Sequence, residues 1–108
     1  MAGTTTLTAA AQSATLPVNV GARVLGAQVV GAFTGSLVPE LSQDGGTTWD
    51  TVQVQKLDGT AAALAITAPG IYRAVVQPIA SGLATQFRLR AATLTAGTPT
   101  VILTAERA

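Results

Sequence analysis

Acidic side chains are the first candidates for chemistry in this sequence of 108 residues. Ahead of the C-terminal segment they are Glu40, Asp44, Asp50 and Asp58. Two carboxyl groups held on either side of a substrate can act as general acid and general base. Asp44 and Asp58, however, each stand before a glycine in a turn-like segment, where aspartate is favoured for backbone reasons alone. We therefore expect no catalytic pair among them.

Hydroxyl and metal chemistry lack the residues that they need. The sequence contains no histidine and no cysteine, so no imidazole or thiolate can activate a hydroxyl or bind zinc. A calcium ion could be held by Asp44, Asp50 and turn carbonyls, but the dense acidic spacing of a calcium loop is missing. We expect no catalytic residue, no metal and no cofactor, and therefore a protein that is not an enzyme.

The segment between Ser42 and Trp49 carries the most informative pattern in the chain. Its defined positions match the Asp-box pattern S-x-D-x-G-x-T-W and are Ser42, Asp44, Gly46, Thr48 and Trp49. The aspartate can accept hydrogen bonds from the backbone amides that follow it, and the glycines can adopt the positive φ that the turn requires. The tryptophan can then fold back over the base of a hairpin. The pattern predicts a structural turn, held by Ser42, Asp44, Gly46 and Trp49, and not an active site.

The composition indicates a protein that works inside an assembly. Charged residues make up 10% of the chain, against about 25% in an average soluble domain, and a surface with so little charge tends to be covered by a partner. The net charge of +1 forms no basic stripe, so direct contact with nucleic acid is not expected. Residues 1–6 lack the charged and apolar regions of a secretory signal, and no apolar run is long enough to span a membrane, so we expect neither element. We expect synthesis in the cytoplasm.

Short β-prone runs separated by glycine and proline predict an all-β domain. The expected strands cover 4–9, 15–20, 23–33, 35–43, 49–55, 60–67, 71–76, 85–94 and 100–105. Alternation in the fourth of these places Glu40 on the solvent face if Leu37 and Leu41 are core. Short helices could form only at the alanine runs 9–11 and 61–63. We expect a β-sandwich, and within that class a jelly roll of eight or nine antiparallel strands.

The division of the chain follows from the same pattern. Residues 14–108 are expected to form the single sandwich domain. Residues 1–13, which are uncharged and rich in threonine and alanine, are expected to be an N-terminal arm or tail that can add a strand to a neighbouring molecule.

Over residues 24–105 the sequence resembles small β-sandwich virion proteins of tailed bacteriophages. The resemblance rests on the turn described above, the Gly-Ile-Tyr-Arg strand at 70–73 and the final strand Thr-Val-Ile-Leu-Thr-Ala at 100–105. Sialidases also carry Asp boxes, but this chain is too short for their propeller. The resemblance implies a decoration, or cement, protein that is made in the host cytoplasm and binds the major capsid protein at the surface of the virion. It also implies association with copies of itself, such as a homotrimer.

Several residues are candidates for contact with partners. Arg88 and Arg90 share one face of a strand and could meet acidic groups on a capsid subunit. Tyr72, and with it Trp49, could stack on sugar rings, so a carbohydrate-binding or adhesion module of a phage tail or baseplate is the alternative function. The remaining candidates lie in the N-terminal arm and are Thr4, Thr5, Thr6 and Leu7.

Overall fold

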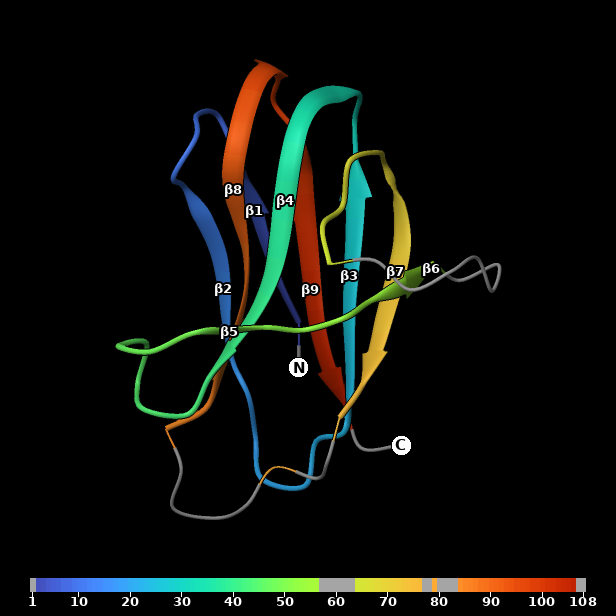
Figure 1. Cartoon of the computed structure of the whole chain (residues 1–108). Helices are drawn as coiled ribbons and strands as arrows, with labels where there is room; N and C mark the ends of the chain where they lie inside the picture. Colours follow the sequence, from blue (N-terminus) through green and yellow to red (C-terminus); the bar gives the residue numbers. More distant parts are fainter. Residues whose placement is uncertain (1, 57–63, 77–78, 80–83, 107–108) are drawn as a thin grey trace.

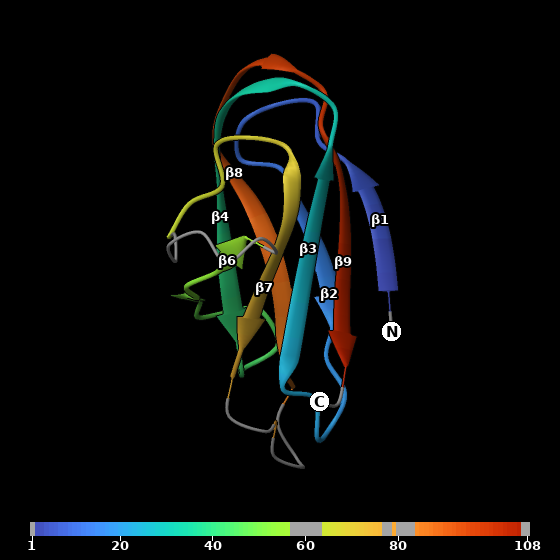
Figure 2. The same cartoon turned by 90° about the vertical axis from the view of Figure 1, so that its right-hand side faces the viewer.

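In the computed structural model, which describes residues 2–56, 64–76, 79 and 84–106, the strands form two antiparallel sheets that pack face to face (Figure 1). The strands are β1 (Ala2–Thr6), β2 (Ser13–Pro17), β3 (Val24–Val30), β4 (Phe33–Ser42), β5 (Asp50–Thr51), β6 (Gln55–Lys56), β7 (Gly70–Val75), β8 (Gln86–Gly97) and β9 (Thr100–Glu106). Figure 2 shows β7, β3, β9 and β1 side by side in front of β4, β8 and β2. The predicted β-sandwich is confirmed.

The order of the strands is that of a jelly roll. One sheet runs β1-β9-β3-β7-β6 and the other runs β2-β8-β4-β5. The chain therefore passes back and forth between the sheets, and its first strand pairs with its last. With β6 set aside as a short addition, the eight remaining strands form the two four-stranded layers of this architecture.

The core is one layer of aliphatic side chains between the sheets. The alternating burial of β3, β8 and β9 follows the two-residue period of a strand. The fully buried side chains of the core include Leu25, Leu37, Phe87, Leu89 and Leu103. Phe87 and Tyr72 contribute the large rings of this core, and the remaining volume is filled by small and medium side chains, as the composition indicates.

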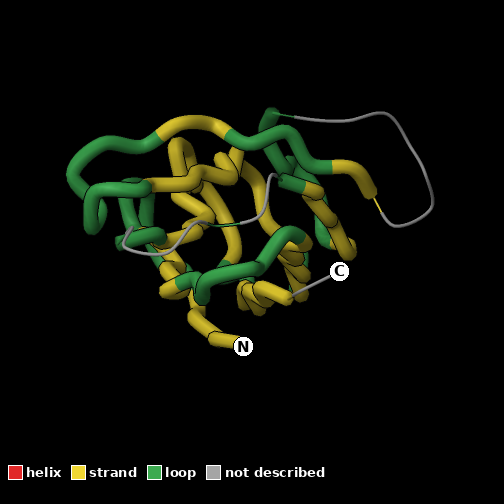
Figure 3. The backbone as a smooth tube through the Cα atoms, turned by 90° about the horizontal axis from the view of Figure 1, so that it is seen from below, coloured by secondary structure: helices red, strands yellow, loops and turns green. Residues whose placement is uncertain are grey.

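Within the described residues every regular element is a strand, and Figure 3 shows yellow strands and green loops without a helix. The alanine run 9–11 forms a turn in which Ala11 has a φ of 72°. The second alanine run, 61–63, and the expected Asp58 turn lie outside the described residues. No helix in the described part of the chain is long and apolar enough to cross a membrane.

Two expected strands differ from the structure. The strand expected at 49–55 is split into β5 and β6 because the chain crosses from one sheet to the other between them, with Val54 buried on the way. Of the strand expected at 60–67, the described part holds only one bridge, between Ile66 and Leu37. A crossing between the sheets therefore replaces the first predicted ladder, and the described part of the second holds one bridge to β4.

The N-terminal segment is part of the sandwich, which corrects the expected arm at 1–13. Strand β1 pairs with β9 from Ala2 to Thr6. Leu7 follows with no exposed surface, and its amide donates to the carbonyl of Pro99 at 2.9 Å. Burial of a leucine side chain stabilises the folded state by about 1.5–3 kcal/mol, so this segment is held by the core. The boundary between residues 13 and 14 is not a domain boundary.

Candidate functional site

The turn between β4 and β5 is closed by the side chains of Ser42 and Asp44. Asp44 Oδ1 accepts hydrogen bonds from the amides of Thr47 at 3.0 Å and Thr48 at 2.8 Å. Ser42 donates its hydroxyl to the same oxygen at 2.8 Å and accepts from the amide of Gly46 at 3.0 Å. The φ angles of Gly45 and Gly46 are 77° and 96°. The turn predicted from the residue types is therefore present. The side-chain oxygens of Ser42 and Asp44 accept hydrogen bonds from backbone amides of this turn.

These hydrogen bonds also set the charge of Asp44. The amide of Thr48, followed by the Ser42 hydroxyl and the Thr47 amide, lowers the pKa of this carboxyl to about 2. A general acid must hold a proton near working pH, and a carboxyl that is ionised above pH 2 does not. The chemistry of Asp44 is that of a fixed hydrogen-bond acceptor.

Trp49 joins this turn to the neighbouring strand β8. Its indole Nε1 donates to the carbonyl of Gly46 at 2.9 Å, so the ring lies back over the turn as expected. The guanidinium carbon of Arg88 stands over the ring, 3.9 Å from its centre. A guanidinium over an indole face is a favourable cation–π arrangement. Trp49 therefore packs within its own domain, half-buried and with Arg88 over its ring.

Glu40 is the centre of an arginine cluster on the outer face of the four-stranded sheet. Arg88 Nε donates to Glu40 Oε1 at 2.7 Å, and Arg90 Nε donates to the same oxygen at 3.0 Å. Arg90 Nη2 reaches Oε2 at 3.4 Å. Burial raises the pKa of the Glu40 carboxyl, but the hydrogen bonds from Arg90 and Arg88 outweigh burial, and the net pKa lies below its ordinary value.

The cluster corrects the expected exposure of Glu40 and adds a contact within the chain for the two arginines, whose contact with a partner stays a prediction. Glu40 lies on the outer face, as predicted, but the two arginines cover it and leave only 7% of it exposed. The arginine pair, expected to be a solvated row or a contact for a partner's acids, is neutralised in part by this chain's own carboxylate. The sequence held a signal for this, because Glu40 and the two arginines each stand at polar, outward positions of strands that alternate with apolar residues. The pairing of β4 with β8, which brings them together, was not visible in the sequence.

Tyr72 is not a stacking platform. Its side chain lies on the inner side of β7 and is only 7% exposed. Its hydroxyl donates to the carbonyl of Ala68 at 2.9 Å. Because Tyr72 is buried and Arg88 lies over the Trp49 ring, the two rings do not form the shared platform that was expected.

The N-terminal candidates separate into two groups. The side chains of Thr4, Thr5 and Thr6 are exposed. Leu7 is fully buried, so the structure removes it from the candidate interface.

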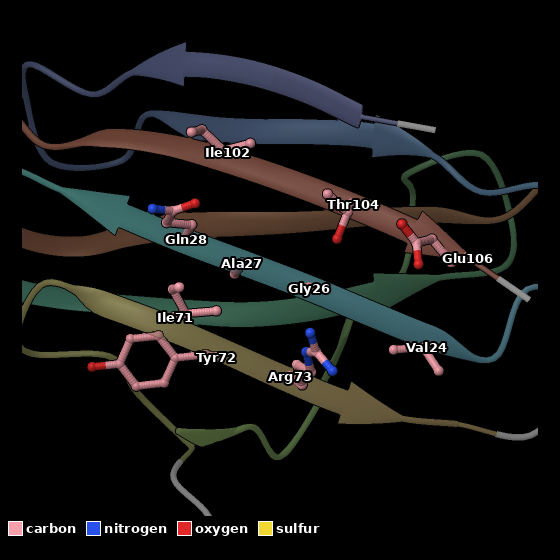
Figure 4. Close-up of a pocket in the computed structure, with 10 residues that line it drawn as sticks. All are labelled: Val24, Gly26, Ala27, Gln28, Ile71, Tyr72, Arg73, Ile102, Thr104 and Glu106. Carbon is pink, nitrogen blue, oxygen red and sulfur yellow. The ribbon is translucent and has the colours of Figure 1, made fainter. Parts of the chain in front are cut away.

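Asp44 and Asp50 do come near one another, since both line a shallow hollow with Thr48 and Val52. No group of three or more metal-ligating side chains occurs in the described part of the chain. A second hollow, of about 430 Å³, lies on the outer face of the five-stranded sheet (Figure 4). Gly26 forms its floor, with Arg73 on β7 to one side and Thr104 on β9 to the other.

The face around this second hollow was not predicted as a surface of interest. Its outward aliphatic side chains include Ile71, which is 39% exposed, Val30, which is 48% exposed, and Val75, which is 73% exposed. Arg73 and Glu106 are its charged groups within the described strands β1, β3, β7 and β9. Period-two alternation over 24–30 could have assigned Gly26 and Val30 to one face, but only the pairing of β3 with β7 and β9 assembles the whole surface.

The fold has a counterpart among solved structures. No protein-family model matches the chain, and no curated protein matches it. The structure is similar to the crystal structure of SPBc2 prophage-derived protein YomS, with a TM-score of 0.56 and 11% sequence identity, over 98% of this chain and 96% of that one. At this identity the likeness shows a shared two-sheet fold that extends over nearly all of both chains.

Proposed function

We propose that this chain is a structural virion protein of a tailed phage, and specifically a decoration protein that binds the outside of the head shell and stabilises it. The observation that carries the proposal is the outer face of the five-stranded sheet, where Val30, Ile71 and Val75 are exposed beside few charges. Contiguous apolar surface on a folded protein is typical of a binding site, and this face gathers three exposed aliphatic side chains. The full-length likeness of fold to a prophage-derived protein supports a phage origin.

The proposed role is adhesive and involves no turnover. The major capsid protein is the first partner, and copies of this chain are the second. Repetition of the same contact by the symmetry of a shell multiplies a weak attachment. Neither nucleic acid nor a membrane is a partner in this proposal.

The direct test is cryo-electron microscopy of the source particle. The proposal expects copies of this chain on the outer surface of the head, with the β3, β7 and β9 face toward the capsid subunits. Density for the chain on a tail or baseplate, or its absence from every virion surface, would refute the decoration role.

A binding assay tests the surface itself. Purified heads that lack the protein are incubated with it and sedimented. Val75→Asp is expected to abolish co-sedimentation, because it places a charge in the aliphatic face. Val20→Asp is the matched control, since Val20 is 48% exposed but lies between β2 and β3, outside the sheets. Equal binding by both variants would show that this face is not the contact.

The carbohydrate-binding alternative is weakened, because Tyr72 is buried and the ring of Trp49 lies against Arg88. A glycan array separates the two functions. The decoration role expects no glycan to bind, whereas specific binding by the folded protein would favour the alternative.

A further inference from the structure

We propose that β1 is the surface through which two copies of this chain associate, edge to edge, so that their five-stranded sheets become continuous. This deepens the self-association part of the proposed function, and it does not require binding to a capsid. It also differs from the expected arm, because β1 stays in its own sheet and accepts the neighbour along its free edge.

The four sheet edges are protected unequally. Natural sheets shield their edges with proline, lysine, bulges or very short strands, since an unshielded edge adds further strands. Strand β2 contains Pro17, whereas β5 and β6 have two residues each. Strand β1 has five residues without charge or proline, and its register with β9 is regular throughout. Among the described edges, β1 alone combines length with none of these shields.

The direction of the backbone groups in β1 follows from one hydrogen bond. The amide of Leu7 points to β9, where it meets the carbonyl of Pro99. Backbone groups alternate in direction along an antiparallel strand, so those of Gly3 and Thr5 also point to β9. The amides and carbonyls of Ala2, Thr4 and Thr6 therefore point away from the sheet, and none pairs with another described strand.

The open edge ends at Thr6. The amide of Thr8, which is next in the outward row, donates to Gln12 Oε1 at 2.8 Å, and the Thr8 hydroxyl donates to the same atom at 3.1 Å. The Gln12 side chain therefore occupies the position beside Thr8 that a neighbouring strand would need. What remains is a short row, Ala2, Thr4 and Thr6, with its middle at Thr4.

A second copy fits this row because the row is symmetric. When two β1 strands run antiparallel about a two-fold axis at Thr4, Thr4 faces Thr4 of the other copy and Ala2 faces Thr6. Every outward amide and carbonyl of both strands then has a partner. Threonine pairs across strands are favourable, and no like charges meet. The contact is closed, because it uses the free edge of both copies and leaves nothing for a third.

The first experiment measures mass against concentration by analytical ultracentrifugation. The expected species is a pair with twice the 10.8 kDa mass of the chain. Thr4→Pro removes the outward amide of residue 4 and leaves every hydrogen bond to β9 in place. The dissociation constant of the pair is therefore expected to rise on the order of tenfold or more. Thr4→Ala keeps the amide and should pair as the parent does. Circular dichroism checks that each variant is folded.

The second experiment tests the register and does not depend on proline. Thr4→Lys and Thr4→Asp each place like charges opposite one another at the axis, so each variant alone is expected to pair on the order of fivefold more weakly. A mixture of the two should recover pairing, because the lysine then faces the aspartate. A mass of one or three chains at all concentrations would overturn the proposal. An unchanged dissociation constant in the substituted proteins would overturn it as well. Capsid binding is scored separately, so either proposal can fail alone.

Discussion

The guanidinium carbon of Arg88 lies 3.9 Å from the centre of the Trp49 ring, and the same side chain donates to Glu40 at 2.7 Å. One arginine on β8 therefore links the turn after β4 to a carboxylate within β4. The turn and the sheet are parts of one packed unit, and the residues that resemble a functional site stabilise the sandwich.

Trp49→Ala should destabilise the protein. The substitution removes the cation–π contact and the hydrogen bond to Gly46, which contribute about 0.5–1.5 kcal/mol each. The expected loss in the free energy of unfolding is roughly 1–3 kcal/mol, measured by urea titration with circular dichroism. Trp49→Phe keeps a ring without the N–H donor and should lose less. Unchanged stability in Trp49→Ala would show that the ring contributes nothing to the turn.

The two arginines around Glu40 should differ in their contributions. Arg88→Gln removes a 2.7 Å charged hydrogen bond and the stack on Trp49, so a loss of about 1–3 kcal/mol is expected. Arg90 is more exposed, at 35% of its side chain against 21% for Arg88. Solvent screens the Arg90 ion pair, and Arg90→Gln should cost less than about 1 kcal/mol. Denaturant titration of both variants decides this, and the reverse order would contradict the cluster geometry.

Stability should fall in acid through the two carboxyl groups with lowered pKa. Asp44 moves from an ordinary value of 3.8 to about 2 in the folded protein, and the pKa of Glu40 lies below its ordinary 4.5. Because the folded values are the lower ones, the stabilisation is complete above about pH 4.5 and is lost as the pH falls toward 2.

Unfolding by urea between pH 7 and pH 2 measures this dependence. The Asp44→Asn variant is the matched control, since it keeps a side-chain oxygen but cannot ionise. Its stability should depend less on pH between 4 and 2 than that of the parent. Parallel curves for the two proteins would mean that Asp44 does not carry the effect.

Leu7→Ala should be among the most damaging single substitutions near the N-terminus. Truncation of a fully buried leucine typically costs about 2–5 kcal/mol. Thr4→Ala, three residues earlier at an exposed position, should stay within about 0.5 kcal/mol of the parent. Thermal and urea unfolding compare the two. A Leu7→Ala protein as stable as the parent would restore the separate arm that the sequence predicts.

Local patterns predicted the parts that local chemistry controls. The turn at Asp44 depends on hydrogen bonds spanning a few residues, so its residue types were sufficient to predict it. The strands at β3, β4, β8 and β9 follow alternating apolar positions, and these formed close to where they were expected. Strand β8 extends three residues further than predicted, to Gly97, because its pairing with β4 continues past two irregularities in register.

The failures involve pairs of residues far apart in the chain. Glu40 is 48 residues from Arg88, and their contact requires the register of β4 against β8. The sequence predicts an arm at the N-terminus because the threonines there carry no core pattern, while the position of Leu7 depends on its hydrogen bond to Pro99, just before β9. Tyr72 is placed on the inner side by the pairing of β7 with β3.

The sequence by itself determined that this protein is an all-β sandwich with a side-chain-closed turn and few charges, because strand period and turn chemistry act over short distances. The tertiary structure decided which side chains are covered, since burial depends on strands from both ends of the chain. It buried Tyr72 and Leu7, paired Glu40 with two arginines, and left an aliphatic sheet face and the edge of β1 open. Contact between distant strands, and not residue type, selects the surfaces available to partners.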